Sequence, residues 1–185
     1  TVDAGDLLVV LFTNDGNATV TTPAGWTTPT GTSTEDSNNQ VRGSVFTKSA
    51  DGTEDGANVN FQTSASEEGS SHVYRIPAGK WRGSSASTDV EANVFNNSDS
   101  NTSGPNGSSL NHSGWGTENT LWITYAAGSS YNRVPTYPTS YENTFHNRSN
   151  TGTGGASTSS ARRPLLAASE DPGAYTMGNS TVGVS

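Results

Sequence analysis

Two short apolar runs, residues 6–13 (DLLVVLFT) and residues 114–126 (GWGTENTLWITYA), constrain the fold of this chain more than any other feature. In both runs, apolar and β-branched side chains occupy successive positions, so both faces of an extended strand carry groups that favour burial. Such a strand needs cover on both sides, which indicates a place inside a two-layer structure. No segment shows the periodicity of a helix. The runs therefore predict two central strands of an all-β fold.

The composition agrees with a thin, polar β domain. The chain has 185 residues, which fits one domain, and only 29% of them are hydrophobic. Charged residues make up 14%, whereas chains kept disordered by polarity usually carry many charges. The polarity comes instead from Ser, Thr, Asn and 21 Gly, which favour strands and turns. We expect a β-sandwich with a narrow core, long polar loops and no significant helix.

Weaker alternating segments predict further strands. These segments are residues 18–22, 40–48, 57–64, 70–76, 89–95, 141–146, 162–169 and 173–178. Residues 150–160 are predicted to form a glycine-rich loop.

The two halves of the chain contain similar segments in the same order. Residues 41–52 (VRGSVFTKSADG) align with residues 161–173 (ARRPLLAASEDPG), because each has an early basic residue, an apolar centre and an acidic turn with glycine. Residues 58–64 align in the same way with residues 174–180. This parallel predicts a jelly-roll-like sandwich made of two related halves.

We expect one sandwich domain over residues 1–185, with half one at about 1–83, a connection at about 84–109 and half two at about 110–185. The counterpart of the strand at residues 70–76 would begin at residues 181–185. The native polypeptide is therefore expected to continue past Ser185 and to begin before Thr1. An intact mass of the purified protein equal to that of residues 1–185 would contradict this expectation.

Charge and cysteine content exclude several classes of partner. The net charge is −8 and the 9 Lys and Arg residues are scattered, whereas binding to a nucleic-acid backbone needs clustered positive charge. The absence of cysteine excludes disulfides and thiolate metal sites. No apolar run approaches the roughly 20 residues that span a bilayer. The sequence thus predicts neither nucleic-acid binding nor membrane insertion.

Candidate catalytic and metal sites are weak. The three histidines lack a ligand-like spacing, and His72 is expected to be a half-buried structural residue. The acidic pairs at 67–68 and 170–171 could be imagined as glycosidase carboxylates, but acidic residues are common at turns of this kind. Residues 51–56 carry closely spaced acids without the full pattern of an EF-hand. We predict no catalytic residue, no cofactor and no metal, and therefore no enzyme.

Aromatic side chains are the remaining candidates for a binding surface. Trp122 is expected in the core, while Trp26 and Trp115 are expected to close the ends of the sandwich. Four aromatic residues are better candidates for contact with a sugar or a neighbouring subunit: Trp81, Tyr131, Tyr137 and Tyr141.

Several short motifs, taken in order, resemble a known family. The motifs DAGDLLVVLF, TTPAGWT, VRGSVFTKSADG and FQTSASE, followed by WGTENTLWITYA and SEDPGAYTM, resemble a β-sandwich domain that recurs in bacteriophage virion proteins and some bacterial surface proteins. The resemblance covers most of the chain and brings no catalytic site.

This resemblance implies a structural protein at the virion surface, such as a capsid decoration or cement protein or part of a surface fibre. Its partners would be the major capsid protein, other virion proteins or copies of itself in a homo-oligomer. The alternative is a carbohydrate-binding adhesion module of a tail fibre or bacterial surface protein, with a host surface glycan as partner.

Overall fold

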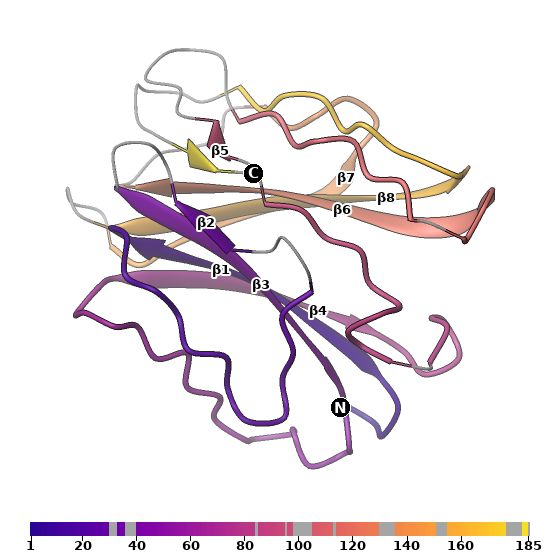
Figure 1. The fold of residues 1–185 in the computed structure, drawn as a ribbon, viewed down its shortest axis with the longest axis horizontal. Helices are drawn as coiled ribbons and strands as arrows, with labels where there is room; N and C mark the ends of the chain where they lie inside the picture. Colours follow the sequence, from indigo (N-terminus) through magenta and orange to yellow (C-terminus); the bar gives the residue numbers. More distant parts are fainter. Residues whose placement is uncertain are drawn as a thin grey trace.

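The structure is a computed structural model that describes residues 1–29, 33–35, 40–83, 85–94, 96–97, 105–112, 114–129, 136–150, 155–176 and 183–184. Within these residues the chain forms nine β-strands and no helix. The strands lie in two layers, one above the other in Figure 1. The expected all-β sandwich is therefore confirmed.

The first sheet, the lower layer in Figure 1, contains four antiparallel strands. They are β1 (Leu7–Asp15), β2 (Ser33–Glu35), β3 (Val41–Ser49) and β4 (Gly69–Ile76). Their order across the sheet is β2-β3-β1-β4, so that the apolar β1 lies inside the sheet.

The second sheet contains the remaining five strands in the order β5-β9-β6-β8-β7. They are β5 (Asn96–Asn97), β6 (Glu118–Ser129), β7 (Glu142–Arg148), β8 (Ala156–Ala167) and β9 (Gly183–Val184). The long strand β6 pairs with β8 over its full length and with β9 at its end.

The strand order of the first sheet returns in the second. The order β2-β3-β1-β4 corresponds to β7-β8-β6-β9, with β5 added beyond β9. This common order agrees with a repeat of two related halves. The repeat and the residue bounds of its halves stay predictions. The jelly-roll connection is not confirmed, because consecutive strands stay within one sheet, whereas a jelly roll winds its strands across both.

Six predicted strands are present with shifted bounds, and they correspond to β1, β3, β4, β6, β7 and β8. The described residues of four other predicted strands form loops with at most isolated bridges: 18–22, 57–64, 89–95 and 173–178. The prediction fails there because alternating apolar residues also suit a loop that lies across a sheet. Val20 and Phe61, for example, pack on the outer face of β1.

The predicted loop at residues 150–160 is also partly wrong, because residues 156–160 begin β8. These Ser, Thr and Ala side chains are buried, and their small size allows β8 to lie close to the first sheet. The Thr158 hydroxyl donates to Thr13 Oγ1 at 2.8 Å and contacts the Ser70 carbonyl oxygen at 3.1 Å. Polar contacts therefore close this end of the sandwich.

A second polar contact lies beside the first. The hydroxyl of Ser160 in β8 is 2.7 Å from Nδ1 of His72 and 2.8 Å from the hydroxyl of Tyr74, both in β4. Burial, and next the nearby charge of His146, lower the pKa of His72 to about 4. Because His72 is only 5% exposed, it is more deeply buried than the sequence predicted.

The apolar core between the sheets lies farther toward the start of β6. Leu7, Val9 and Leu11 of β1 face Tyr125 and Ala127 of β6. Because side chains alternate along a strand, the intervening residues of both strands point away from this core.

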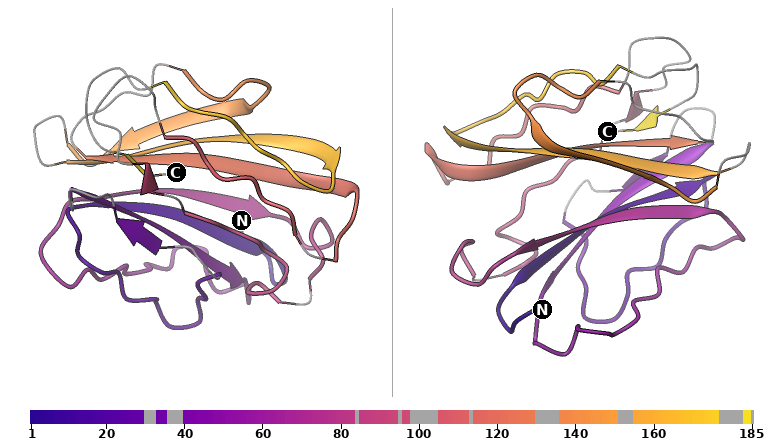
Figure 2. Two further views of the ribbon diagram at one scale, coloured as in Figure 1. Left: turned by 45° about the horizontal axis from the view of Figure 1, so that its top comes forward. Right: turned by 180° about the vertical axis from the view of Figure 1, so that it is seen from behind.

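Loops cover the outward faces of both sheets (Figures 1 and 2). On the first sheet, Phe61 stacks on Phe12 at 5.5 Å between ring centroids and meets Trp26 edge-on at 5.8 Å. Trp26 therefore packs on an outer face of the sandwich. The prediction that it closes an end of the sandwich is wrong. On the second sheet, Trp122 is buried as expected, and Tyr175 lies fully buried within the loop layer.

Candidate binding site

A cavity of about 430 Å³ lies between the sheets at the end where β6 begins. This end is on the right in Figure 1, where the two layers separate. Leu7, Val9 and Leu11 of β1 line it from the first sheet, and Ile123 and Tyr125 of β6 line it from the second. The cavity is thus an extension of the apolar core that opens to solvent.

Trp81 lines this cavity and belongs to the turn that follows β4. Its indole nitrogen donates a hydrogen bond to the Gly5 carbonyl oxygen at 2.9 Å, which fixes the ring relative to the start of β1. The ring packs against the apolar core and is half-buried. Trp81 therefore forms an apolar wall whose polar atom already has a partner.

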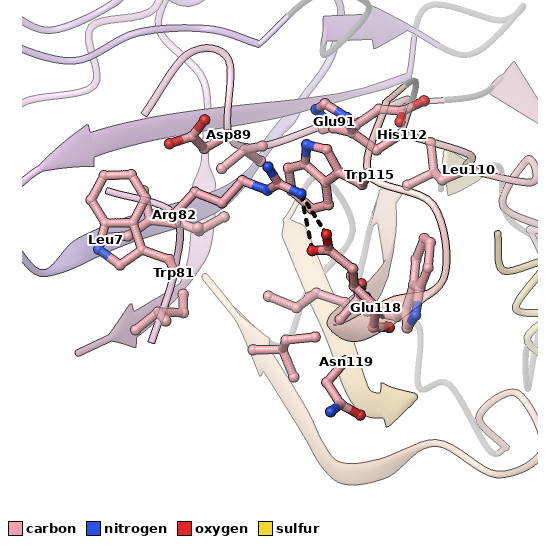
Figure 3. Close-up of a pocket in the computed structure, with 18 of the residues that line it drawn as sticks. Leu7, Trp81, Arg82, Asp89, Glu91, Leu110, His112, Trp115, Glu118 and Asn119 are labelled. Carbon is pink, nitrogen blue, oxygen red and sulfur yellow. Dashed lines mark hydrogen bonds and ion pairs between the residues drawn. The ribbon is translucent and has the colours of Figure 1, made fainter. Parts of the chain in front are cut away.

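An ion pair connects the two sheets at the same opening. Both carboxylate oxygens of Glu118, the first residue of β6, accept from Nη2 of Arg82 at 2.8 and 3.0 Å. The Arg82 guanidinium lies 4.8 Å from the centre of the Trp115 ring, and His112 stacks on that ring at 3.8 Å. Figure 3 shows Arg82 reaching from the Trp81 side of the cavity to Glu118.

Two further side chains at the opening, those of Asp89 and His112, also have protein partners. Asp89 accepts a hydrogen bond from the Ser85 backbone nitrogen at 3.0 Å. His112 Nε2 lies 3.1 Å from the Thr88 carbonyl oxygen. These contacts leave the interior of the cavity apolar and concentrate polarity at its rim.

The size of the cavity has an energetic consequence. Apolar side chains that face an unfilled space lack the packing contacts of a filled core, which costs stability. Water entering through the opening relieves part of this cost, although an apolar lining offers water few hydrogen bonds. An apolar occupant would therefore stabilise the protein.

The predicted contact residues do not gather at one site. Trp81 lines the cavity, whereas Tyr137 and Tyr141 lie on the outer side of the second sheet. Tyr131 lies outside the described residues.

Tyr137 and Tyr141 are engaged within the protein. The Tyr137 hydroxyl donates to the Phe145 carbonyl oxygen at 3.0 Å, and its ring meets Tyr175 at 5.7 Å. Tyr141 lies beside Glu170, and burial is the main cause that raises its pKa. Both side chains therefore hold the loop layer on the second sheet.

The sequence prediction missed Arg82, His112 and Glu118, and it assigned Trp115 to the scaffold. All four lie at the rim of the cavity. A signal was present in the sequence, because a charged residue follows each of two tryptophans within three residues. The positive Arg82 follows Trp81, and the negative Glu118 follows Trp115. Tryptophans beside complementary charges at the ends of strands suggest a contact between two elements.

The other candidate sites have structural roles. In the turn at residues 51–56, Glu54 pairs with Lys48 at 2.8 Å and accepts from two backbone nitrogens of its own turn. Within the described residues, no three or more His, Asp or Glu side chains are placed to hold a metal. The same part of the chain contains no helix long and apolar enough to cross a membrane.

Comparisons with known proteins leave the family open: no family model, no curated protein and no solved structure matches this chain.

Proposed function

We propose that this chain is a non-enzymatic surface component of a bacteriophage virion, which attaches through the open end of the sandwich. Its partners would be the major capsid protein, other virion proteins or further copies of the chain. The observation that carries the proposal is the opening itself, where Trp81 and Arg82 frame an apolar cavity. Tryptophan and arginine are the residue types that most often dominate the energetics of protein interfaces.

The virion setting rests only on the resemblance of the ordered sequence motifs to phage β-sandwich domains. The architecture suits that role, because polar loops cover the outward faces of both sheets. Among the described residues, the large apolar lining lies at the open end. Attachment there would add stability by mass action.

A second candidate is the recognition of a host surface glycan at the same rim. Glu91, Asn93 and Asn119 line the same cavity as Trp81 and Trp115. Carboxylates and amides can hydrogen-bond sugar hydroxyls while an indole ring covers an apolar sugar face. Asn93 already donates to the Ser108 hydroxyl at 2.8 Å, which leaves fewer free groups for a sugar. We therefore rank this function second.

Co-sedimentation of the purified chain with empty capsids tests the first proposal. We expect saturable binding with a fixed number of copies per particle and no preference on a glycan array. Trp81→Ala should weaken binding by about tenfold or more, because it removes one of the two indole rings at the opening. Phe145→Ser is the matched control, since Phe145 is 61% exposed and lies on β7, outside the cavity lining.

Three results would contradict attachment through the open end. A folded Trp81→Ala variant that binds capsids as well as the native chain would exclude the rim. Loss of binding in Phe145→Ser alone would place the contact at the β7 edge. Glycan-array signals that disappear in Trp81→Ala, without capsid binding by the native chain, would favour the glycan function.

A further inference from the structure

We infer that the cavity between the sheets is a binding site for an uncharged, lipophilic small molecule. This inference goes beyond the proposed attachment function, because a free molecule inside the sandwich needs neither a virion nor a macromolecular partner. The size of the cavity, about 430 Å³, lies within the range of small-molecule sites.

The lining determines the chemistry of the occupant. Aliphatic side chains of β1, such as Leu7 and Val9, face Ile123 of β6 across the cavity, and Trp81 adds an aromatic wall. The one polar atom of Trp81 is bonded to Gly5. These groups attract apolar surface and provide no hydrogen bonds for the hydroxyl groups of a sugar. The hydroxyl of Tyr125, which also lines the cavity, is itself buried.

The charges at the rim select against an ionic ligand. Arg82 and Glu118 neutralise each other through two hydrogen bonds, and Asp89 is bonded to the Ser85 backbone nitrogen. Lys80 and Glu91 add one charge of each sign, and both are exposed at the outer rim. A carboxylate or sulfonate entering the cavity would lose its hydration without gaining an unpaired cation in the interior. An uncharged molecule avoids this penalty.

The ion pair also separates the outer rim from the interior of the cavity. Because Arg82 and Glu118 join the turn after β4 to the start of β6, they cross the opening (Figure 3). A small molecule can enter beside this pair and reach the interior. A capsid partner would contact Trp81 and the other rim residues from outside, so the two kinds of binding use different parts of the opening.

Two fluorescent probes with the same apolar framework test the inference: neutral N-phenylnaphthylamine and its anionic relative anilinonaphthalene sulfonate. We expect the purified native chain to bind one neutral molecule saturably, roughly tenfold or more tighter than the anion. A large excess of methyl glucoside should not displace the neutral probe.

Ala92→Phe provides the variant arm. Ala92 lines the cavity from a loop, so a phenyl group there should fill part of the space without interrupting a sheet. We expect it to weaken the neutral probe at least about tenfold. Phe145→Ser is again the control and should bind the probe as the native chain does, because it removes an exposed apolar ring away from the cavity.

A measurement on the native chain complements the variants. Methyl NMR signals of Leu7, Val9 and Ile123 should shift on addition of the neutral probe, while those of the exposed Val59 and Val73 should not. This mapping decides the question if Ala92→Phe fails to fold.

Several outcomes would overturn the inference. They are equal affinity for the neutral and anionic probes, a folded Ala92→Phe variant with native affinity, loss of binding in Phe145→Ser, or shifts confined to Val59 and Val73. The absence of saturable binding by the folded native chain would also overturn it. None of these outcomes bears on attachment to capsids, which the co-sedimentation of Trp81→Ala tests separately.

Discussion

The two ends of the sandwich hold the same pair of sheets together by opposite means. At the end where β8 begins, small hydroxyl side chains lie in direct contact, with Thr158 bonded to Thr13 and Ser160 bonded to His72. At the end where β6 begins, large apolar side chains line a cavity, and the Arg82–Glu118 ion pair crosses its opening. One end is closed by polar contacts, and the other is apolar and open.

This difference shows that polar residues can supply the tighter contact in a chain with few hydrophobic residues. Ser and Thr are small enough for two sheets to approach and can hydrogen-bond across the gap. Their bonds have strict geometry, so the closed end should tolerate little change. The open end lacks this geometric restriction and can admit a ligand.

The largest expected effect is a disruption of the closed end by Ser160→Leu. The larger side chain would force the sheets apart and remove the partner of both His72 and Tyr74. We expect a loss of about 4 kcal/mol in the free energy of unfolding, measured with urea. Ser169→Leu, at an exposed position, should change stability by less than about 0.5 kcal/mol. Similar losses in both variants would contradict the contrast between the two ends.

The next largest effect is a dependence on pH at the closed end. The pKa of His72 is lowered from 6.5 to about 4 in the folded protein. Because the unfolded chain binds the proton first, this contribution to stability is complete above pH 6.5 and is lost as the pH falls toward 4. We expect a loss of about 3 kcal/mol between neutral pH and pH 4, which His72→Gln should abolish.

Urea unfolding at several pH values, with native and His72→Gln proteins in parallel, measures this difference. Asp6 titrates in a separate range, because its hydrogen bond with Arg75, followed by that with the Asp3 backbone, lowers its pKa to about 2. An unchanged pH dependence in His72→Gln would assign the acid sensitivity to other groups.

A smaller effect, of opposite sign, is expected at Tyr125 beside the cavity. Its hydroxyl is buried without a hydrogen-bond partner in the described structure, and burial raises its pKa well above the usual range. Tyr125→Phe should therefore stabilise the protein by about 1 kcal/mol in thermal or urea unfolding. A clear loss of stability would show that the hydroxyl has a partner in solution.

The smallest effect on stability is expected for Arg82→Gln at the open end. Arg82 and Glu118 are 42% and 47% exposed, so their pair should contribute less than about 0.5 kcal/mol. Access to the cavity should change more, and we expect the neutral probe to associate several-fold faster in stopped-flow measurements. An unchanged association rate would mean that the pair does not control entry.

Much of the fold could be predicted from the sequence, and particular residues show why. The runs around Leu11 and Ile123 carry apolar or β-branched side chains on both faces, which indicates central strands, and both form inner strands of their sheets. Phe61 misled the prediction, because its alternating neighbours serve a loop that covers β1. The residues at 156–160 gave no signal, since Ser and Ala lack strand preference and only the contact with the other sheet determines their conformation.

The site was less predictable than the fold. Trp81 was selected for its position in a turn, which is local information. The cavity depends on the distance between sheets, and on contacts such as Arg82 with Glu118 that join residues 36 positions apart. No local pattern encodes such a distance.

Each sheet is formed by one continuous stretch of the chain, and this has a consequence for biosynthesis. The strands β1 to β4 complete their hydrogen bonding within residues 7–76, before any residue of the second sheet is needed. The first sheet can therefore form on the ribosome while the second is being translated. The late event is then the docking of two preformed sheets, and a nascent chain stalled before β6 would expose the apolar face of β1 to chaperones.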